Sequence, residues 1–535
     1  MPTLHWIGKD KVVNHHHEVP YRVLNLEEQV RAPAEAPENS VDNKIIHGDN
    51  LEVLKSLLPE YESQVDCIYI DPPYNTGNEG WVYNDNLKDP KLTKWLGAVV
   101  GKEGEDLSRH DKWLCMMYPR MKLLHRLLAR DGIIFISLDD TEAAHARVML
   151  DEIFGYGNFL AAIAWEKRYT RSNNAKLFYS VKDTILVYRK SAAVSEIKEG
   201  RTASADANYT NPDGDERGAW MTASYVNPAT KAMRPKLVYK ITAPDGRIVE
   251  HPTHAWKYAE AEHLKHKADN RLWWGQNGDA TFPRLKQFLS EAGGMVPVDL
   301  WSYEETGTTD EAGQEIKSIF GSLVFDTPKP TRLIERILKI ATKPGALILD
   351  SFAGSGATAH AVLKLNAADN GNRRFILVET MEYASSITAE RVKRVINGYG
   401  GDESGAMPAL GGGFNYYTIG ETLFTADGEL NDSVGTEAIR GYIAYTEGIP
   451  AEYRTPVDNP VSPHLLGLSP EMGWLFNYAP DQATCLNMEY LSGLNFGDKK
   501  PASAIIYADR CLLSKAFLQD HGIIFKKIPR DVTRF

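Results

Sequence analysis

The sequence predicts an α/β protein with a mostly parallel central sheet, and three observations carry this prediction. Short apolar runs alternate with helical stretches over residues 41–190 and again over 316–400. The apolar runs lack polar alternation, which is typical of strands buried on both faces. Between these halves, residues 191–315 lose the rhythm and mix turns, aromatic side chains and basic side chains. We therefore expect one sheet that a separate region interrupts.

In the first half, the expected elements follow from the apolar runs and the turns between them. Strands are expected at 45–47, 66–70, 133–137, 159–167 and 183–190. Helical spacing predicts helices over 51–61 and 113–132, the second of which should stop at Gly132.

The second half repeats this alternation. A helix is expected to start at Pro330. A strand at 346–350, a glycine turn at 351–356, a helix at 357–367 and a strand at 374–379 should follow it.

The composition is that of an ordinary globular protein. The chain has 535 residues, 43% of them hydrophobic and 24% charged, which excludes a disordered or fibrous protein. The four cysteines form no Cys-x-x-Cys pair, so neither a zinc ribbon nor a disulfide framework is expected. No apolar run approaches the roughly 18 residues of a membrane helix, and the N-terminus is too polar for a signal peptide. These features predict a cytoplasmic protein without a membrane partner.

Both ends of the chain differ from the α/β halves. Residues 1–40 are expected to form an irregular N-terminal arm, with histidines 15–17 on a solvated segment, and no metal site is predicted. Residues 401–535, which begin with a glycine-rich linker, are expected to form a C-terminal interaction domain. The net charge of −11 hides an asymmetry: 161–290 carries an excess of seven positive charges and 401–535 an excess of seven negative ones. The first region suits an anionic partner and the second does not.

The glycine turn is a candidate cofactor site. Gly354-Ser355-Gly356 stands between a buried strand and a helix, where glycines let a cofactor approach and the helix N-terminus donates N–H groups. Glu379 ends the next strand, where an acidic residue suits ribose hydroxyls. Ala359 replaces the third glycine of Gly-x-Gly-x-x-Gly, which disfavours a dinucleotide and a nicotinamide oxidoreductase. A purely structural turn is the alternative.

The second candidate site is the turn Asp71-Pro72-Pro73-Tyr74, directly after a buried strand. The prolines end the strand and hold the turn rigid. Asp71 and the Pro72 carbonyl offer two hydrogen-bond acceptors and Tyr74 an aromatic face, at the strand end where open sheets keep their sites. This combination suits a planar amine. A rigid turn with a capping Asp and a core Tyr is the alternative.

Together the two motifs resemble the signatures of S-adenosylmethionine-dependent amino-methyltransferases of DNA. Their order, with Asp-Pro-Pro-Tyr before Phe-Ala-Gly-Ser-Gly, resembles the permuted β class. The segments HGDNLEVLKSLLPEY, WLCMMYPRMKLL and FDTPKPTRLIERIL are similar to the modification (Mod) subunit of type III restriction–modification systems. The resemblance implies a permuted Rossmann-like methyltransferase sheet. Its catalytic half would be 41–190, its target-recognition domain 191–315 and its cofactor-binding half 316–400, with a C-terminal extension.

The resemblance also implies roles for single residues. The expected cofactor is S-adenosylmethionine. The residues expected to be catalytic are Asp71, Pro72, Pro73 and Tyr74. The residues expected to bind the cofactor are Asp49, Lys329, Asp350, Phe352, Ala353, Gly354, Ser355, Gly356 and Glu379. Helix capping is the alternative for Asp49, and an ordinary proline-initiated helix is the alternative for Lys329.

A basic loop at 167–182 is a candidate DNA contact. It contains five basic residues and no acidic one, a composition that suits phosphate and base contacts. The residues expected to bind DNA are Lys167, Arg168, Arg171, Asn173, Asn174 and Lys176. A solvated loop is the alternative.

The expected activity is N6-methylation of a flipped-out adenine in double-stranded DNA, within a restriction–modification or related defence system. N4-cytosine methylation is disfavoured because its motif usually opens with Ser rather than Asp. A catalytically silent DNA-specificity subunit of a nuclease complex is the alternative from another class. The expected partners are double-stranded DNA, a second copy of the chain in a homodimer, and a restriction (nuclease-helicase) subunit.

Overall fold

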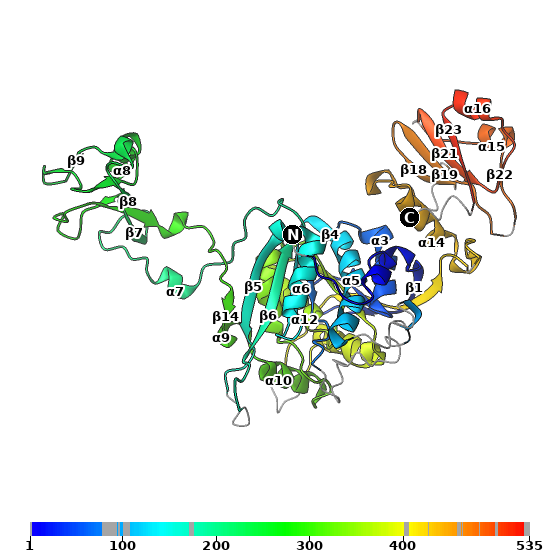
Figure 1. Ribbon diagram of the computed structural model, residues 1–535, viewed down its shortest axis with the longest axis horizontal. Coiled ribbons are helices and arrows are strands. Elements are labelled where there is room, and N and C mark those ends of the chain that lie inside the picture. Colours follow the sequence, from blue (N-terminus) through cyan, green and yellow to red (C-terminus); the bar gives the residue numbers. More distant parts are fainter. Residues whose placement is uncertain are drawn as a thin grey trace. The chain divides into compact units, whose positions relative to one another are not determined.

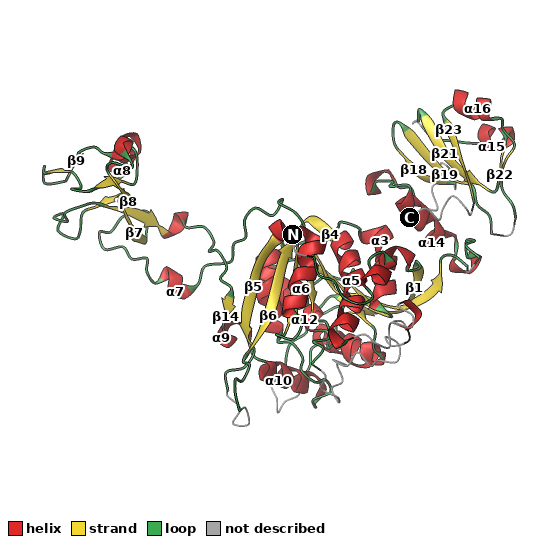
Figure 2. Cartoon of the chain, viewed as in Figure 1, coloured by secondary structure: helices red, strands yellow, loops and turns green. Residues whose placement is uncertain are grey.

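The chain forms two compact units (Figures 1 and 2). The computed structural model describes residues 3–76, 94, 97–99, 108–170, 176–400, 406–425, 427–456, 462, 464–480, 482–497 and 501–528. The smaller unit is Ile197–Pro297, and the larger one consists of Met1–Glu196 with Val298–Phe535. The smaller unit falls inside the segment 191–315, in which the sequence loses its α/β rhythm.

The larger unit contains a ten-stranded sheet, so the predicted α/β fold class is confirmed. The strand order is β1 (Arg22–Arg31), β17 (Gly413–Thr422), β2 (Lys44–His47), β16 (Arg374–Glu379), β15 (Leu347–Asp350), β3 (Val65–Ile70), β4 (Leu128–Leu138), β6 (Lys182–Arg189), β5 (Phe159–Glu166) and β14 (Leu300–Trp301). The strands from β17 to β4 are parallel, whereas β1, β6 and β5 form antiparallel pairs. Strands from both halves of the sequence thus pair directly in the permuted order.

Helices cover the two faces of this sheet. On one face α3 (Asn50–Tyr61), α5 (Arg109–Leu127) and α6 (Ala143–Leu150) share a core with alternate strand residues such as Ile68 and Leu349. The neighbouring strand residues point to the other face, where α11 (Thr331–Ala341) and α12 (Ala357–Asp369) contact the strands. The helices α10 (Thr309–Phe320) and α13 (Glu390–Asn397) contact each other nearby.

Three local expectations are wrong. Helix α5 ends at Leu127, because Leu128 adopts an extended conformation and starts β4, in which Gly132 packs tightly against the Val65 carbonyl. The N-terminal arm is not irregular, since β1 pairs with β17 along its length. His16 is buried at 4% exposure rather than solvated, and burial lowers its pKa to about 3.

The segment 401–535 also contributes to the main sheet, through β17. Beyond it, α14 (Thr436–Thr446) precedes a second sheet of β18 (Leu465–Leu468), β19 (Met472–Phe476), β21 (Ser503–Ala508) and β23 (Ile523–Lys527). Tyr442 of α14 packs edge-on against Tyr21, with ring centroids 4.6 Å apart. Apolar packing therefore joins this part of the chain to the N-terminal segment.

The smaller unit has its own core. A three-stranded sheet of β12 (Leu272–Trp273), β13 (Arg284–Phe288) and β7 (Trp220–Ser224) is accompanied by helix α8 (Glu260–Ala268). Tyr225, Trp256 and Trp274 lie in an aromatic core, and Lys286, which is 1% exposed, pairs with Asp215 at 3.0 Å. Aromatic packing and a buried ion pair hold this small unit together.

None of the helices in the described part of the chain is both long and apolar enough to span a lipid bilayer.

Candidate active site

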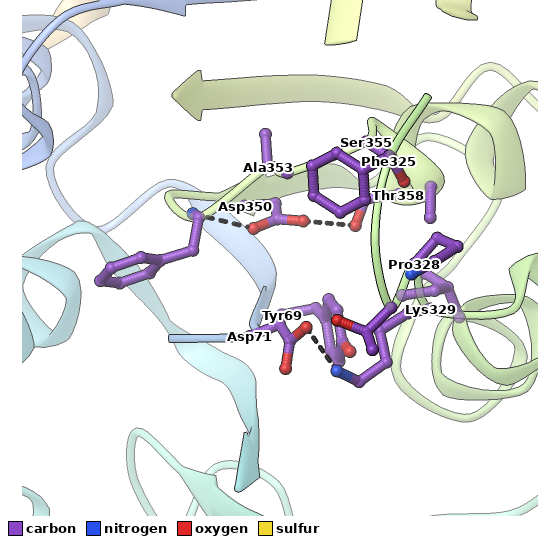
Figure 3. Close-up of a pocket in the computed structure, with 14 residues that line it drawn as sticks. Tyr69, Asp71, Phe325, Pro328, Lys329, Asp350, Ala353, Ser355 and Thr358 are labelled. Atoms are coloured by element: carbon purple, nitrogen blue, oxygen red, sulfur yellow. Dashed lines mark hydrogen bonds and ion pairs between the residues drawn. The ribbon is translucent and has the colours of Figure 1, made fainter. Parts of the chain in front are cut away.

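A pocket opens where the order of the sheet reverses. The parallel neighbours β15 and β3 continue in opposite directions along the sheet, β15 through α12 to β16 and β3 through α5 to β4. Such a switch point leaves a crevice at the carboxyl ends of the strands. The pocket there has about 300 Å³ of empty space, which includes space open to solvent (Figure 3). Its lining residues are Tyr69, Asp71, Phe325, Thr327, Pro328, Lys329, Ile334, Asp350, Phe352, Ala353, Gly354, Ser355, Ala357 and Thr358.

The glycine turn forms one wall of the pocket, and its backbone needs glycine. Gly354 has a φ of 52° and Gly356 a φ of 80°, both in the left-handed region. A Cβ atom on Gly356 would also lie 3.0 Å from the Thr388 carbonyl oxygen. Asp350 ties the turn together, since its carboxylate accepts from the Phe352 N–H at 3.0 Å and from the Thr358 hydroxyl at 2.5 Å. The turn is therefore preformed.

Glu379 supports this turn from the neighbouring strand. Its two carboxylate oxygens accept from the backbone N–H of Gly354 at 2.8 Å and of Met381 at 3.0 Å. The side chain is 5% exposed and is not among the pocket-lining residues. These contacts give Glu379 a role in holding the glycine turn, and its contact with a ribose stays a prediction.

Burial raises the pKa of two carboxyl groups beside the glycine turn, Asp350, which lines the pocket, and Glu379, which lies behind the turn. It raises the pKa of Asp350 to about 7, with hydrogen bonds from Thr358 and Phe352 acting in the opposite direction. Burial likewise raises the pKa of Glu379 to about 7. Because loss of either proton leaves a negative charge in a poorly solvated place, the pocket favours a cationic ligand over an anionic one.

Asp71 lies on the opposite wall; it is the first residue of the turn Asp71-Pro72-Pro73-Tyr74, which is predicted to be catalytic and is called the catalytic turn below, whereas Pro72, Pro73 and Tyr74 are not among the lining residues. Asp71 follows the last residue of β3, and its Oδ2 accepts from Lys329 Nζ at 2.5 Å (Figure 3). Its Oδ1 is buried and has no hydrogen-bond partner among the described residues. Pro72 is buried, and the Pro73 carbonyl accepts from Trp113 Nε1 at 2.7 Å. The turn is fixed, and one carboxylate oxygen remains to accept a hydrogen bond from a ligand.

Two contacts hold the side chain of Tyr74, one to its hydroxyl and one to its ring. Its hydroxyl donates to Asp183 Oδ2 at 3.4 Å, and the Lys329 ammonium lies 4.9 Å from its ring centroid. Burial raises the pKa of its phenol well above the ordinary value, so the hydroxyl keeps its proton. Lys329 thus contacts both Asp71 and Tyr74.

A hydrogen-bonded cluster supports the far end of the same turn. Asn75 has a φ of 61°, and its Nδ2 donates to the Arg109 carbonyl at 3.2 Å and to Glu142. Glu142 is fully buried and also bonds to Nδ1 of His110 at 2.8 Å and of His145 at 3.0 Å. Both imidazole Nδ1 atoms bond to a carboxylate oxygen of Glu142, whereas Asn75 Oδ1 is buried without a hydrogen-bond partner among the described residues.

Three of the predicted cofactor residues are not among the pocket-lining residues: Asp49, Gly356 and Glu379. Asp49 caps α3 by accepting from the Leu51 N–H at 2.9 Å, while Asn50 beside it donates to the Ser351 carbonyl at 3.2 Å. Asp49 therefore lies next to the glycine turn but does not line the pocket. Lys329 does line the pocket, and it is paired with Asp71.

The predicted DNA-binding residues do not act as a uniform basic surface. Lys167 pairs with Asp183 at 2.6 Å, the carboxylate that also binds Tyr74, and Arg168 donates to the Tyr179 hydroxyl at 2.8 Å. Lys176 is exposed. Three of the predicted residues lie outside the described part of the chain: Arg171, Asn173 and Asn174.

The family of the chain follows from comparison with known proteins. A family described as DNA methylase matches residues 65–390, which include both the catalytic turn and the glycine turn. The chain belongs to this DNA methylase family. The chain is 36% identical over 351 residues to the type III restriction-modification enzyme StyLTI Mod subunit of Salmonella typhimurium, covering 63% of this chain and 52% of that protein.

Two further relatives are similar over much of the chain. It is 31% identical over 417 residues to the EcoPI Mod subunit of Escherichia phage P1, covering 71% of this chain and 64% of the relative. It is 31% identical over 361 residues to the type II methyltransferase M.KpnI of Klebsiella pneumoniae, covering 64% of this chain and 82% of the relative. The alignments thus span 52% and 64% of the two Mod subunits.

Sequence reasoning missed several residues that line the pocket. Tyr69 precedes Asp71 by two positions, and this spacing along a strand could have placed both on one side of the sheet. Thr327 and Pro328 directly precede Lys329, and Thr327 has a φ of 49°, which is rare for a non-glycine residue. Phe325 is 3% exposed and packs edge-on against Tyr383. No local pattern marks Phe325 as a pocket residue.

Proposed function

We propose that this methylase transfers a methyl group from S-adenosylmethionine to N6 of a flipped-out adenine in double-stranded DNA. The observation that carries the proposal is Asp71 Oδ1, a buried acceptor without a partner among the described residues, in the same pocket as the glycine turn. Asp as the first residue of the motif favours adenine over cytosine N4. Named relatives that are Mod subunits and a type II methyltransferase support the same assignment.

The pocket fits the cofactor in shape and charge. Its glycine turn admits a ligand close to the backbone, and α12 directs its N-terminus toward the same place. Asp350 and Glu379 favour a cation, which suits a sulfonium. When bound, S-adenosylmethionine supplies an electrophilic methyl group. Phe325 and Phe352 provide apolar walls, while Asp49 would contact the adenine ring as the family resemblance implies.

The catalytic turn supplies the acceptors for the target amine. The nitrogen of adenine N6 is a poor nucleophile because its lone pair is delocalised into the ring. Lys329 occupies Asp71 Oδ2, which leaves Oδ1 to accept one N–H of the amine, and the Pro72 carbonyl accepts the other. Two fixed acceptors orient the lone pair and stabilise positive charge as it develops on nitrogen. Tyr74 offers its ring as a stacking surface for the flipped base.

The remaining parts of the chain suit recognition and assembly. The unit Ile197–Pro297 is proposed to read the DNA sequence, together with the basic loop 167–182. The acidic segment 401–535 is poorly suited to DNA because like charges repel. It is proposed to bind protein: a second copy in a homodimer, a restriction (nuclease-helicase) subunit, or both. The methylase would act on cytoplasmic DNA within a restriction–modification or related defence system.

A product analysis tests the proposal. The purified protein is incubated with unmethylated bacterial DNA and S-adenosylmethionine that carries a labelled methyl group, and the DNA is digested to nucleosides. The proposal requires label in N6-methyladenine. Label in N4-methylcytosine, or a protein that binds DNA and cofactor without turnover, would favour one of the two alternatives. Methylation-aware sequencing of a host with and without the gene then gives the site, which exchange of residues 197–297 with a relative's segment should change.

A further inference from the structure

The loop between β5 and β6 displays two large apolar side chains to solvent. Leu177 is 93% exposed and Phe178 is 102% exposed, the highest values for large apolar side chains among the described residues. Apolar side chains scattered singly over a surface are ordinary, but two adjacent ones at full exposure call for a partner.

The root of this loop contacts the catalytic turn. Asp183, at the start of β6, binds Lys167 at 2.6 Å from the other side of the loop and accepts from the Tyr74 hydroxyl at 3.4 Å. The Lys167 N–H also donates to the Val181 carbonyl at 2.9 Å, which closes the base of the loop. The loop is therefore fixed at its base to the residue that would stack on the target base.

The loop also leaves the sheet at the edge that carries Asp71. At the start of β6, Thr184 pairs with Leu138, which is at the carboxyl end of β4. Two residues earlier in β4, Ile136 pairs with Ile70 of β3, the residue before Asp71. Phe178 lies five positions before Asp183, and a fully extended chain spans at most ~18 Å over five positions. Phe178 therefore stays within reach of DNA whose target base enters the pocket.

The surroundings of these side chains suit a polyanion. Lys176, next to Leu177, is exposed, and residues 167–182 contain no acidic residue, although Lys167 and Lys182 at the base of the loop are paired with Asp183 and Asp140. Cationic side chains beside an apolar residue are the combination with which proteins hold a duplex and separate its base steps. A lipid surface or a protein partner would not require the connection to Tyr74.

We propose that Phe178, with Leu177 beside it, enters the duplex and fills the space that the flipped adenine leaves. This inference rests on the proposed function and adds to it the residue that stabilises the extruded state. A flipped base leaves its two neighbouring base pairs unstacked. An aromatic ring inserted there stacks on both, because every base offers a flat π-face.

The test compares two duplexes that differ only in the cost of flipping. One carries 2-aminopurine at the methylated position in a matched pair, and the other carries it in a mismatch, where unpairing is already achieved. Two quantities are measured: the fluorescence increase on binding, and kcat/KM on the corresponding adenine substrates. On the matched duplex, Phe178→Ala should reduce both by about tenfold. On the mismatched duplex, it should reduce both by less than about threefold. Phe178→Trp should restore both readouts. Tyr156→Ala, at an aromatic residue that is 67% exposed and lies outside this loop, is the matched control and should change neither.

Three results would overturn the inference. The first is an equal loss of kcat/KM for Phe178→Ala on both duplexes, and the second is no loss on either. The third is a change in the molar mass of Phe178→Ala by light scattering without a change in fluorescence, which would make Phe178 a protein contact. Failure of the proposed function is distinguishable, because the wild-type protein would then methylate neither duplex.

Discussion

Replacing Asp71 by alanine is the most direct test of the catalytic turn. The substitution removes the buried Oδ1 that would accept the target amine and leaves the glycine turn and the residues 197–297 untouched. A charged acceptor placed at the reacting nitrogen contributes about 4 kcal/mol to the stability of the transition state, which corresponds to a loss of about 10³-fold in rate. We therefore expect methylation to fall by about three orders of magnitude while cofactor affinity changes little.

The structure adds a second consequence, which a careful experiment must separate from the first. Asp71 is 18% exposed and pairs with Lys329, which is 11% exposed. Loss of the carboxylate leaves a largely buried ammonium without this partner, which we expect to lower the free energy of unfolding by about 1–3 kcal/mol, because both side chains keep some contact with water. The double variant Asp71→Ala/Lys329→Met removes both charges, so it should recover stability without recovering activity.

Three measurements are made on each variant. Transfer of a labelled methyl group to DNA gives the activity, calorimetric titration gives the cofactor affinity, and thermal unfolding gives the stability. Asp71→Asn serves as the isosteric control, which keeps one acceptor oxygen but loses the charge. Turnover of Asp71→Ala within about tenfold of wild type, with cofactor binding intact, would refute the mechanism and make the turn structural.

The remaining predictions concern the two walls of the pocket. Gly354→Leu should abolish measurable cofactor binding by calorimetry without unfolding the protein, because its side chain would occupy the ligand's space; unchanged affinity would contradict this. Because the pKa values of Asp350 and Glu379 are raised to about 7, both carboxyls ionise as the pH rises through 7. The affinity for cationic S-adenosylmethionine, measured by calorimetry, should therefore rise from pH 6 to pH 8. The affinity for the neutral thioether product should rise less, and an equal rise for both ligands would contradict this. Tyr74→Ala should weaken binding of the flipped base by ~1–3 kcal/mol. Tyr74→Phe should weaken this binding by less than about 1 kcal/mol, since the hydrogen bond from the hydroxyl to Asp183 is long at 3.4 Å. In titrations with 2-aminopurine DNA, an equal loss of binding free energy in both variants would show that the hydroxyl, and not the ring, makes the contribution.

Much of the fold and both walls of the pocket could be predicted from local sequence. The apolar runs that end at Asp71 and Asp350 identify buried parallel strands, since such runs bury both faces. The two prolines after Asp71 and the glycines at 354 and 356 end those strands in turns that few other residues could form. The site was predictable where its chemistry lies within a few consecutive residues.

The tertiary structure decided which partner each charged side chain of the site has. Lys329 meets Asp71 across 258 residues of sequence, Glu379 uses both oxygens to hold the glycine turn, and Lys167 is neutralised by Asp183. Strand β1, whose sequence looked irregular, is stabilised by pairing with β17, nearly four hundred residues away. Local sequence determines backbone shape because steric preferences act between neighbours. The charge state and the free hydrogen-bonding capacity of a side chain depend on which atoms the folded chain brings within about 3 Å of it.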